Sequence, residues 1–312
     1  MMNNFAEKFE QLEKDIINEQ RKMPVNAPLS VFYGITSEKL FRLAFVSKIR
    51  PFELESTKQI KVTQGKESVE VYWTCFDLIN EDAKDVFFIF CDSLIQSIEN
   101  AGDEASALNN LKERYYAWKL LLKNKGKMSY EMYQGLYGEL YFLSEYIGNQ
   151  FNIDDAVKAW AGPDGYSKDF SIGNHWFEIK TIGTSSTCVK INSLSQLDSE
   201  ISGHLVTIVV EKMSEQFNSG LCGVHELYDS ILNRIKSPIV KDEFANKVLK
   251  YGYIDDDNPL NNHKFEVKRI KFYKVDNSFP RLTKENIKNP AIANVTYDVL
   301  INAIEKYVEE YK

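Results

Sequence analysis

A glycine–asparagine dipeptide at residues 173–174 constrains the fold of its surroundings more tightly than any other feature of the sequence. It separates two short runs of mixed apolar and polar residues, KDFSI and HWFEIK. A two-residue loop of this composition favours a type I′ or II′ turn, so we expect a β-hairpin. Counting outward from the turn fixes the expected cross-strand pairs, which are Ile172 with His175, Ser171 with Trp176, Phe170 with Phe177, and Asp169 with Glu178.

This hairpin would bring two carboxylates and a lysine to one face. Because side chains alternate along a strand, Asp169, Glu178 and Lys180 share a face, and the apolar residues between them form the other. Directly opposed Cβ atoms lie about 4.5–5.5 Å apart, so the carboxylates repel each other unless a cation offsets their charge. Hard divalent cations bind carboxylate oxygens, and the main-chain carbonyl of Ile179 is a further candidate ligand. The alternative is a solvated strand face with a simple Glu178–Lys180 ion pair.

A third carboxylate lies on the helix that we expect over residues 129–147. Glu139 lies on a mostly apolar stripe of this helix, where a lone charge costs free energy. Gly135 and Gly138 beside it would let another part of the chain approach closely. Glu139 is therefore either a buried glutamate paired with a lysine or with main chain, or an acid that contributes to the same cation site.

A strip of basic residues occupies the segment 263–274, HKFEVKRIKFYK, which carries five lysine and arginine residues and one glutamate. Lys264, Lys268, Arg269 and Lys271 are the candidates for contacts with nucleic-acid phosphates. An exposed edge strand protected by lysines is an equally good interpretation.

The chain as a whole is acidic, with a net charge of −7. A nucleic-acid-binding protein usually has a basic footprint, so contact with nucleic acid would need a local patch, a bound cation or a partner subunit. Four cysteines without a CxxC pair indicate reduced thiols. No apolar run is long enough to span a bilayer and no signal-peptide pattern is present, so we expect a cytoplasmic protein.

Three blocks of the sequence differ in the elements they predict. Residues 1–128 indicate an α+β domain, residues 129–218 a mixed α/β core, and residues 219–312 an α/β extension that completes the fold or binds a partner or DNA. Apolar periodicity predicts strands at 29–36, 39–48, 67–78, 204–213 and 263–275, and a buried strand at 85–94 that runs into a helix. It predicts helices at 106–124, 223–237, 241–252 and 295–311, and a first helix with the stripe Phe5, Phe9, Leu12 and Ile16. Ser193 and Gln196 have the spacing of a capping box, which predicts a further helix from residue 193.

A glutamate on a helix, then an aspartate, then Glu-x-Lys on the next strand resembles the PD-(D/E)XK nuclease superfamily. A closer resemblance is to a bacterial group of PD-(D/E)XK motif proteins, which are encoded near restriction–modification and phage-defence genes. The segments that carry it are GLYGELYFL, W-x-GP, DF…FEIKT, SLSQLD, and FPRLTKENI followed by VTYDV. The resemblance spans most of the chain after residue 130.

The resemblance implies a restriction-endonuclease-like core, in which helices flank a mixed central sheet. It implies that Asp169 and Glu178 are metal ligands, that Lys180 is the catalytic lysine, and that Glu139 is the helix acid. The literal Pro-Asp pair of the motif is Pro163-Asp164, which makes Asp164 an alternative to Asp169. Asp164 lies between two glycines in an expected β-turn, so we favour Asp169.

Gln196 occupies the place where several superfamily members carry a glutamine in the site, although the capping box alone would also explain it. The implied function is a Mg²⁺-dependent endonuclease, with Mn²⁺ as a substitute, that hydrolyses DNA in a restriction or phage-defence system. One site per chain would favour a homodimer for cutting both strands, and other subunits of a defence system are expected partners. The alternative is a non-catalytic subunit that uses the fold to bind DNA or to scaffold a complex.

Overall fold

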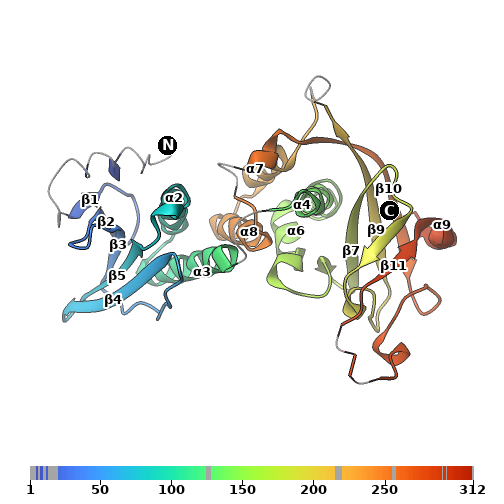
Figure 1. The fold of residues 1–312 in the computed structure, drawn as a ribbon, viewed down its shortest axis with the longest axis horizontal. Helices are drawn as coiled ribbons and strands as arrows, with labels where there is room; N and C mark the ends of the chain where they lie inside the picture. The colour runs from blue at the N-terminus through green and yellow to red at the C-terminus, as the bar shows by residue number, and fades with distance from the viewer. Residues whose placement is uncertain are drawn as a thin grey trace. The chain divides into compact units, whose positions relative to one another are not determined.

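The computed structural model describes residues 5, 8–9, 12, 20–123, 128–214, 220–254, 258–289, 291–292 and 294–310. The chain forms two compact units, residues 1–126 and 127–312 (Figure 1). The division lies beside the expected boundary at residue 128, whereas the blocks 129–218 and 219–312 share the second unit. None of the helices in the described ranges is long and apolar enough to cross a membrane.

The N-terminal unit is an antiparallel sheet with helices on one face (Figure 1). Its five strands have the order β1-β2-β3-β5-β4. They are β1 (Gln20–Met23), β2 (Ser30–Ile35), β3 (Phe41–Ser47), β4 (Ile60–Ser68) and β5 (Val71–Leu78). Helices α2 (Lys84–Glu99) and α3 (Glu104–Lys123) bury aromatic side chains against them. The ring of Phe76 on β5 has its centroid 5.5 Å from that of Phe90 and 5.2 Å from that of Tyr115, so both helices share one core with the sheet.

The strand expected at residues 85–94 is wrong, because these residues belong to α2. Phe87, Phe90 and Leu94 are spaced to lie on one side of a helix, and all three are buried. A short apolar run is compatible with either element, and packing between the sheet and α3 decides for the helix. Strands β1 and β4 were not expected, since their sequences QRKM and IKVTQGKES are largely polar. Phe5, Phe9 and Leu12 of the expected first helix are buried, while Ile16 lies outside the described residues.

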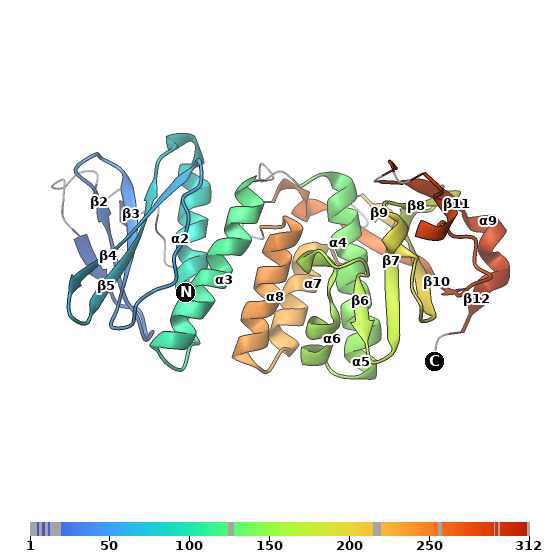
Figure 2. The same cartoon turned by 90° about the horizontal axis from the view of Figure 1, so that it is seen from below.

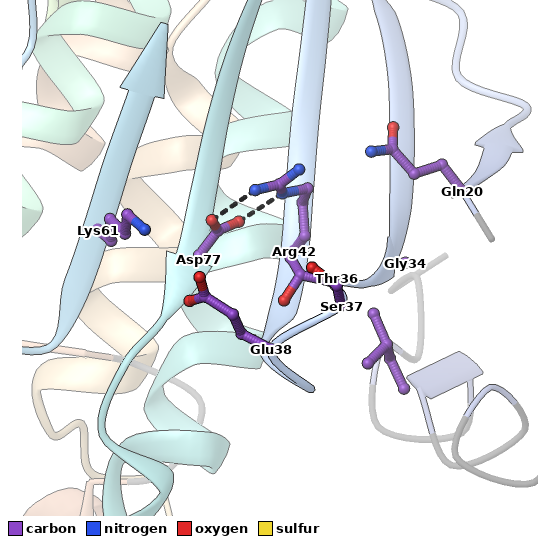
Figure 3. A pocket seen from close by; sticks show the side chains of 9 residues that line it. Gln20, Gly34, Thr36, Ser37, Glu38, Arg42, Lys61 and Asp77 are labelled. Carbon is purple, nitrogen blue, oxygen red and sulfur yellow. Dashed lines mark hydrogen bonds and ion pairs between the residues drawn. The ribbon is translucent and has the colours of Figure 1, made fainter. Parts of the chain in front are cut away.

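A polar pocket in this unit is lined by residues of all five strands and of the loop at 36–38 (Figure 3). The buried carboxylate of Asp77 accepts two hydrogen bonds from Arg42, at 2.6 Å from Nε and 2.7 Å from Nη2. Glu38 and Lys61 add one charge of each sign to the lining. The charges of the pocket therefore balance, and none of the expected catalytic residues lies in it.

The second unit is built on a mixed five-stranded sheet with the order β12-β10-β9-β7-β6. Its strands are β6 (Phe170–Ile172), β7 (His175–Gly183), β9 (Gly203–Met213), β10 (Lys264–Val275) and β12 (Val308–Glu309). Strands β7 and β9 are parallel and the other pairs are antiparallel. The mixed α/β class expected from the sequence is confirmed, and a strand from the expected C-terminal extension, β10, is a member of the central sheet.

Helices cover one face of this sheet and a small second sheet covers the other (Figures 1 and 2). The helices are α4 (Tyr130–Phe142), α6 (Ile153–Ala159), α7 (Val224–Arg234) and α8 (Pro238–Tyr251). On the opposite face, β8 (Cys188–Ile191) pairs with β11 (Tyr297–Leu300), next to α9 (Ile301–Ile304). Gly138 lets α4 approach β7, because a Cβ atom there would lie 1.8 Å from the hydroxyl oxygen of Thr181.

Two expected helices of this unit are wrong. The capping box at residue 193 does not form, and only a 3₁₀ turn, η4 (Leu194–Gln196), follows it. Where they are described, residues 295–311 form β11, the short α9, a 3₁₀ turn and β12, because Tyr297–Leu300 pairs with β8 and Val299 packs into the core beneath that pair. In both places a tertiary contact outweighs a weak local preference for helix.

Candidate active site

The hairpin that carries the motif has the expected register over its three strand pairs. Phe170 lies opposite Phe177, Ser171 opposite Trp176, and Ile172 opposite His175. Gly173 has a φ of +58°, which Asn174 does not share, so the turn is of type II′ and not type I′. The ladder ends at Phe170, and the expected Asp169–Glu178 pair is not part of it. The side chain of Asp169 instead accepts a hydrogen bond from the main-chain N–H of Ile179, 2.7 Å from Oδ2.

Glu178 on β7 is fully buried, and its charge is poorly compensated. Its Oε1 lies 2.9 Å from the ammonium group of Lys180, on the same strand. Neither carboxylate oxygen has a well-directed hydrogen bond within the described part of the chain. Burial and then the charge of Asp169 raise the pKa of Glu178, Lys180 lowers it, and the net result is a pKa of about 8. Burial alone would lower the pKa of Lys180, but the carboxylates around it raise that pKa above its usual value.

Glu139 on α4 belongs to the same cluster from the helical side of the sheet. It is almost fully buried, and burial followed by the charge of Asp169 raises its pKa well above the usual value. One interpretation of the sequence required a lysine or main-chain donor for Glu139, and the donors found among the described residues are of neither kind. They are the indole Nε1 of Trp160, 2.7 Å from Oε2, and the hydroxyl of Tyr251, 3.0 Å from Oε1.

The absence of a side chain at Gly162 keeps space between two of the acids. A Cβ atom at this position would lie 3.0 Å from Oδ1 of Asp169 and 3.4 Å from Oε2 of Glu139. Two carboxylate oxygens from different elements therefore face the same small volume. The glycine of the W-x-GP segment is the residue that leaves this volume open.

The residues of this cluster fit a hard divalent cation. Buried carboxylates repel one another and lack a full set of donors, and a cation that binds oxygen ligands supplies the missing charge. Within the described ranges, no group of three His, Cys, Asp or Glu side chains has the arrangement of a complete metal site. A cation here would accordingly be held by Asp169 and Glu178, with main-chain oxygen such as that of Ile179 and water completing its ligands.

The alternative aspartate, Asp164, has different partners. It ends the 3₁₀ turn η3 (Gly162–Asp164), and its Oδ1 lies 2.7 Å from the ammonium group of Lys250 on α8. A second lysine of α8, Lys247, lies 3.7 Å from its Oδ2. These ion pairs bind the loop to α8, so Asp164 anchors the loop. It is Asp169 that contacts the hairpin.

Gln196 lies beside the lysine of the motif. Its Oε1 accepts a hydrogen bond from the main-chain N–H of Asn192 at 2.7 Å and lies 3.4 Å from the ammonium group of Lys180. The side chain therefore turns toward the site and does not complete the expected capping box with Ser193. This contact is consistent with a place for Gln196 in the site.

Lys168 is a second lysine of the site region that sequence reasoning missed. Its ammonium group donates to the carbonyl oxygens of Ser195, Gln196 and Asp198, at 2.6, 2.7 and 3.1 Å. It also lies 4.1 Å from the ring centroid of Trp176, and burial lowers its pKa to about 8. Lys168 thus fixes the turn that carries Gln196. No pattern in the sequence distinguishes this lysine from a surface lysine.

The basic strip on β10 is largely neutralised by neighbouring carboxylates. Lys264 forms an ion pair with Glu226. Lys268 lies 2.8 Å from Glu266 and 2.9 Å from Glu211, and Lys271 lies 2.6 Å from Glu305. Of the four candidate phosphate contacts, only Arg269 lacks an ion pair in the described part of the chain. The three lysines therefore do not form a free basic patch. Among the described residues, strand β10 pairs with β12 only at Phe272 and Tyr273, so the segment that carries these lysines lies along the edge of the sheet.

A known protein family matches nearly the whole chain. The model of a family described as "Putative PD-(D/E)XK family member" (DUF4420) matches residues 5–302. No curated protein and no solved structure matches the chain. The matched range covers most of both compact units and includes the cluster of Glu139, Asp169, Glu178 and Lys180. The chain therefore belongs to this family, and the PD-(D/E)XK superfamily expected from the sequence is confirmed.

Proposed function

We propose that this protein is a metal-dependent nuclease that hydrolyses phosphodiester bonds in DNA. The observation that carries the proposal is the buried Glu178, which lacks well-directed hydrogen bonds among the described residues and lies beside Asp169 and Lys180. A chain that kept such a group only for stability would lose free energy, because removing a carboxylate from water costs several kcal/mol and a single ion pair offsets this only when further hydrogen bonds complete it. Membership of a PD-(D/E)XK family supports the same chemistry.

The proposed ligands of a Mg²⁺ ion, or of Mn²⁺ as its substitute, are Asp169, Glu178 and the carbonyl of Ile179. A bound divalent cation lowers the pKa of its water and offsets the charge of a phosphate group. The carboxylate of Asp169 is already oriented, because its Oδ2 accepts a hydrogen bond from the N–H of Ile179 and its Oδ1 remains near Gly162. This hydrogen bond holds the side chain of Asp169 against strand β7, which supports the proposed pairing of Asp169 with Glu178.

The other residues of the cluster act through position and charge. Lys180 remains cationic in its contacts with Glu178 and Gln196, so its ammonium group can hold a water molecule or stabilise negative charge on a phosphate oxygen. Glu139 faces the volume next to Asp169 and can accept a hydrogen bond from a water there. Burial keeps these interactions strong, since the local dielectric is low.

The experiment that tests this proposal is cleavage of supercoiled plasmid with Mg²⁺ or Mn²⁺, with EDTA as the metal-free control. Asp169→Asn and Lys180→Met should each abolish cleavage, and Asp164→Asn should retain it. Cleavage that survives in both of the first two variants would refute the assignment. If Asp164→Asn abolishes cleavage and Asp169→Asn retains it, the proposed ligand is Asp164 and not Asp169.

DNA is the proposed substrate and a homodimer is the proposed assembly. Comparison of double-stranded DNA, single-stranded DNA and RNA as substrates tests the choice of DNA. A homodimer in the cytoplasm, together with other subunits of a restriction or phage-defence system, is proposed because one chain offers one site. Light scattering of the protein with and without DNA measures the assembly state.

A second candidate is a non-catalytic subunit that binds DNA or scaffolds a complex. The neutralised lysines of β10 and the net charge of −7 favour it, since both leave little electrostatic attraction for a DNA strand. DNA binding that is unaffected by EDTA, with no cleavage under any metal condition, would support this candidate against the nuclease.

A further inference from the structure

Two aromatic donors from separate parts of the chain hold Glu139. Trp160 precedes η3, and Tyr251 is the last residue of α8, 112 residues from Glu139. Their rings stack with centroids 6.4 Å apart and an interplanar angle of 29°. Each donates to a different oxygen of the carboxylate. The side chain of Glu139 is therefore held against rotation from both ends.

Gly135 makes room for one of these donors. It lies one helical turn before Glu139 on α4, so both residues lie on the same side of the helix. A Cβ atom at Gly135 would lie 2.9 Å from the hydroxyl oxygen of Tyr251. A side chain at this position would require the hydroxyl of Tyr251 to shift and would strain its hydrogen bond to Glu139, which gives a physical reason for glycine within a helix.

The held carboxylate is directed at the proposed cation site. Oε2 of Glu139, which accepts the indole N–H, is the oxygen that shares the space beside Gly162 with Oδ1 of Asp169. A carboxylate oxygen retains acceptor capacity after one hydrogen bond. The remaining capacity of this oxygen is available to the volume between the two acids.

We infer that Trp160 and Tyr251 are positioning residues that hold Glu139 toward the Asp169–Glu178 pair. This inference rests on the proposed function, because it gives Glu139 a place in the surroundings of the bound cation. Partners that orient the groups around a metal typically change metal affinity or activity by about 10–100-fold when they are removed. Tyr251 is the better residue to test, since phenylalanine removes only the hydroxyl.

The contact itself is tested without metal or substrate. The chain has four tryptophans, so a ¹H–¹⁵N spectrum contains four indole signals, and loss of one in Trp160→Phe assigns that of Trp160. Tyr251→Phe and Glu139→Gln should each shift the Trp160 signal and leave those of Trp73, Trp118 and Trp176 in place. An unmoved Trp160 signal in both variants would overturn the inference.

The positioning role is tested by Mn²⁺ affinity in a double-mutant cycle. Tyr251→Phe should weaken Mn²⁺ binding about tenfold, and it should have no further effect in a Glu139→Gln background. Effects that add, or affinity that is unchanged in both single variants, would overturn the inference because Tyr251 would then not act through Glu139.

The crowding at Gly135 provides a rescue experiment. Gly135→Ala should weaken Mn²⁺ binding in the wild type, and should have no additional effect in Tyr251→Phe, where the hydroxyl is gone. Gly138→Ala is the matched control, since its new methyl group would clash with Thr181. That variant should lower Tm equally in both backgrounds. A loss from Gly135→Ala that persists in Tyr251→Phe would count against the inference.

Failure of this inference differs from failure of the proposed function. Mn²⁺ binding that shows the predicted cycle without any cleavage would leave the positioning role intact and refute the nuclease. Wild-type protein that binds Mn²⁺ but shows additive or absent effects would refute only the positioning role. Wild-type protein that binds no Mn²⁺ would refute both.

Discussion

Replacing the buried Glu178 by glutamine should stabilise the metal-free protein at alkaline pH. The pKa of this carboxyl is raised from an ordinary value of 4.5 to about 8, so the folded protein binds its proton more tightly than the unfolded chain does. The stability that this proton confers is complete below about pH 4.5 and is lost as the pH rises toward 8. Glutamine imitates the protonated form and does not titrate, so the variant keeps that stability.

The size of the effect follows from the shift. Each pKa unit corresponds to about 1.36 kcal/mol, so a shift of this size predicts a difference in the free energy of unfolding on the order of 3–5 kcal/mol at pH 8.5. At pH 5 the wild type and Glu178→Gln should unfold at nearly the same urea concentration. Addition of Mn²⁺ at pH 8 should stabilise the wild type, because a ligand that binds only the folded state adds stability. It should not stabilise the variant.

The assay is urea unfolding in EDTA between pH 5 and 8.5. The indole NMR signals of Trp160 and Trp176 are followed because both residues belong to the second unit. Glu200→Gln, at an exposed glutamate, makes the same charge change at the surface and is the control. If the free energies of unfolding of the wild type and Glu178→Gln differ by the same amount at every pH, the pKa of Glu178 is the same in the folded and unfolded protein. The reasoning from its burial would then be wrong.

Three further predictions concern Lys168, Gly203 and the basic strip of β10. Lys168→Met should speed hydrogen exchange at residues 194–198 and reduce cleavage more than tenfold. Lys247→Met is the control, because it removes another buried lysine, which donates to the carbonyl of Val157; it should lower Tm without this local exchange. Equal exchange in both variants would contradict the anchoring role of Lys168. Gly203→Ala should lower Tm, by an amount worth about 1–3 kcal/mol for overpacking, because its Cβ would lie 2.1 Å from the ring of Trp176. Arg269→Ala should weaken DNA binding more than alanine at any of the three paired lysines of β10, and equal losses in a salt titration would show that the ion pairs open on binding.

The elements that the sequence predicted correctly are those set by local rules. The register of the hairpin followed from a two-residue turn, and Gly173 alone supplies the positive φ that it needs. The strand β9 and the helices α3, α4, α7 and α8 followed from long, strongly periodic apolar patterns. The segments at 85–94, 193–196 and 295–311 have weaker patterns, and contacts with distant residues decided them.

The candidate site divides in the same way. Its motif residues lie within one hairpin and one helix, so turn geometry and strand alternation placed Glu178 and Lys180 together. The choice of Asp169 over Asp164 gained its support from contacts, since Lys250 on α8 holds Asp164 elsewhere. Asp169 itself reaches Ile179 as a side-chain acceptor beyond the end of the ladder, and not as the cross-strand partner that counting predicted.

The sequence by itself determined the hairpin, its acids and lysine, and the superfamily, because these depend on residues that are near neighbours along the chain. Only the tertiary structure decided which residues donate hydrogen bonds to Glu139, which residue anchors the turn of Gln196, and whether the lysines of β10 form ion pairs. Tyr251, Lys168 and Glu305 reach their partners across gaps of up to 112 residues. Such contacts form because the folded core brings the groups together, and no local pattern records them.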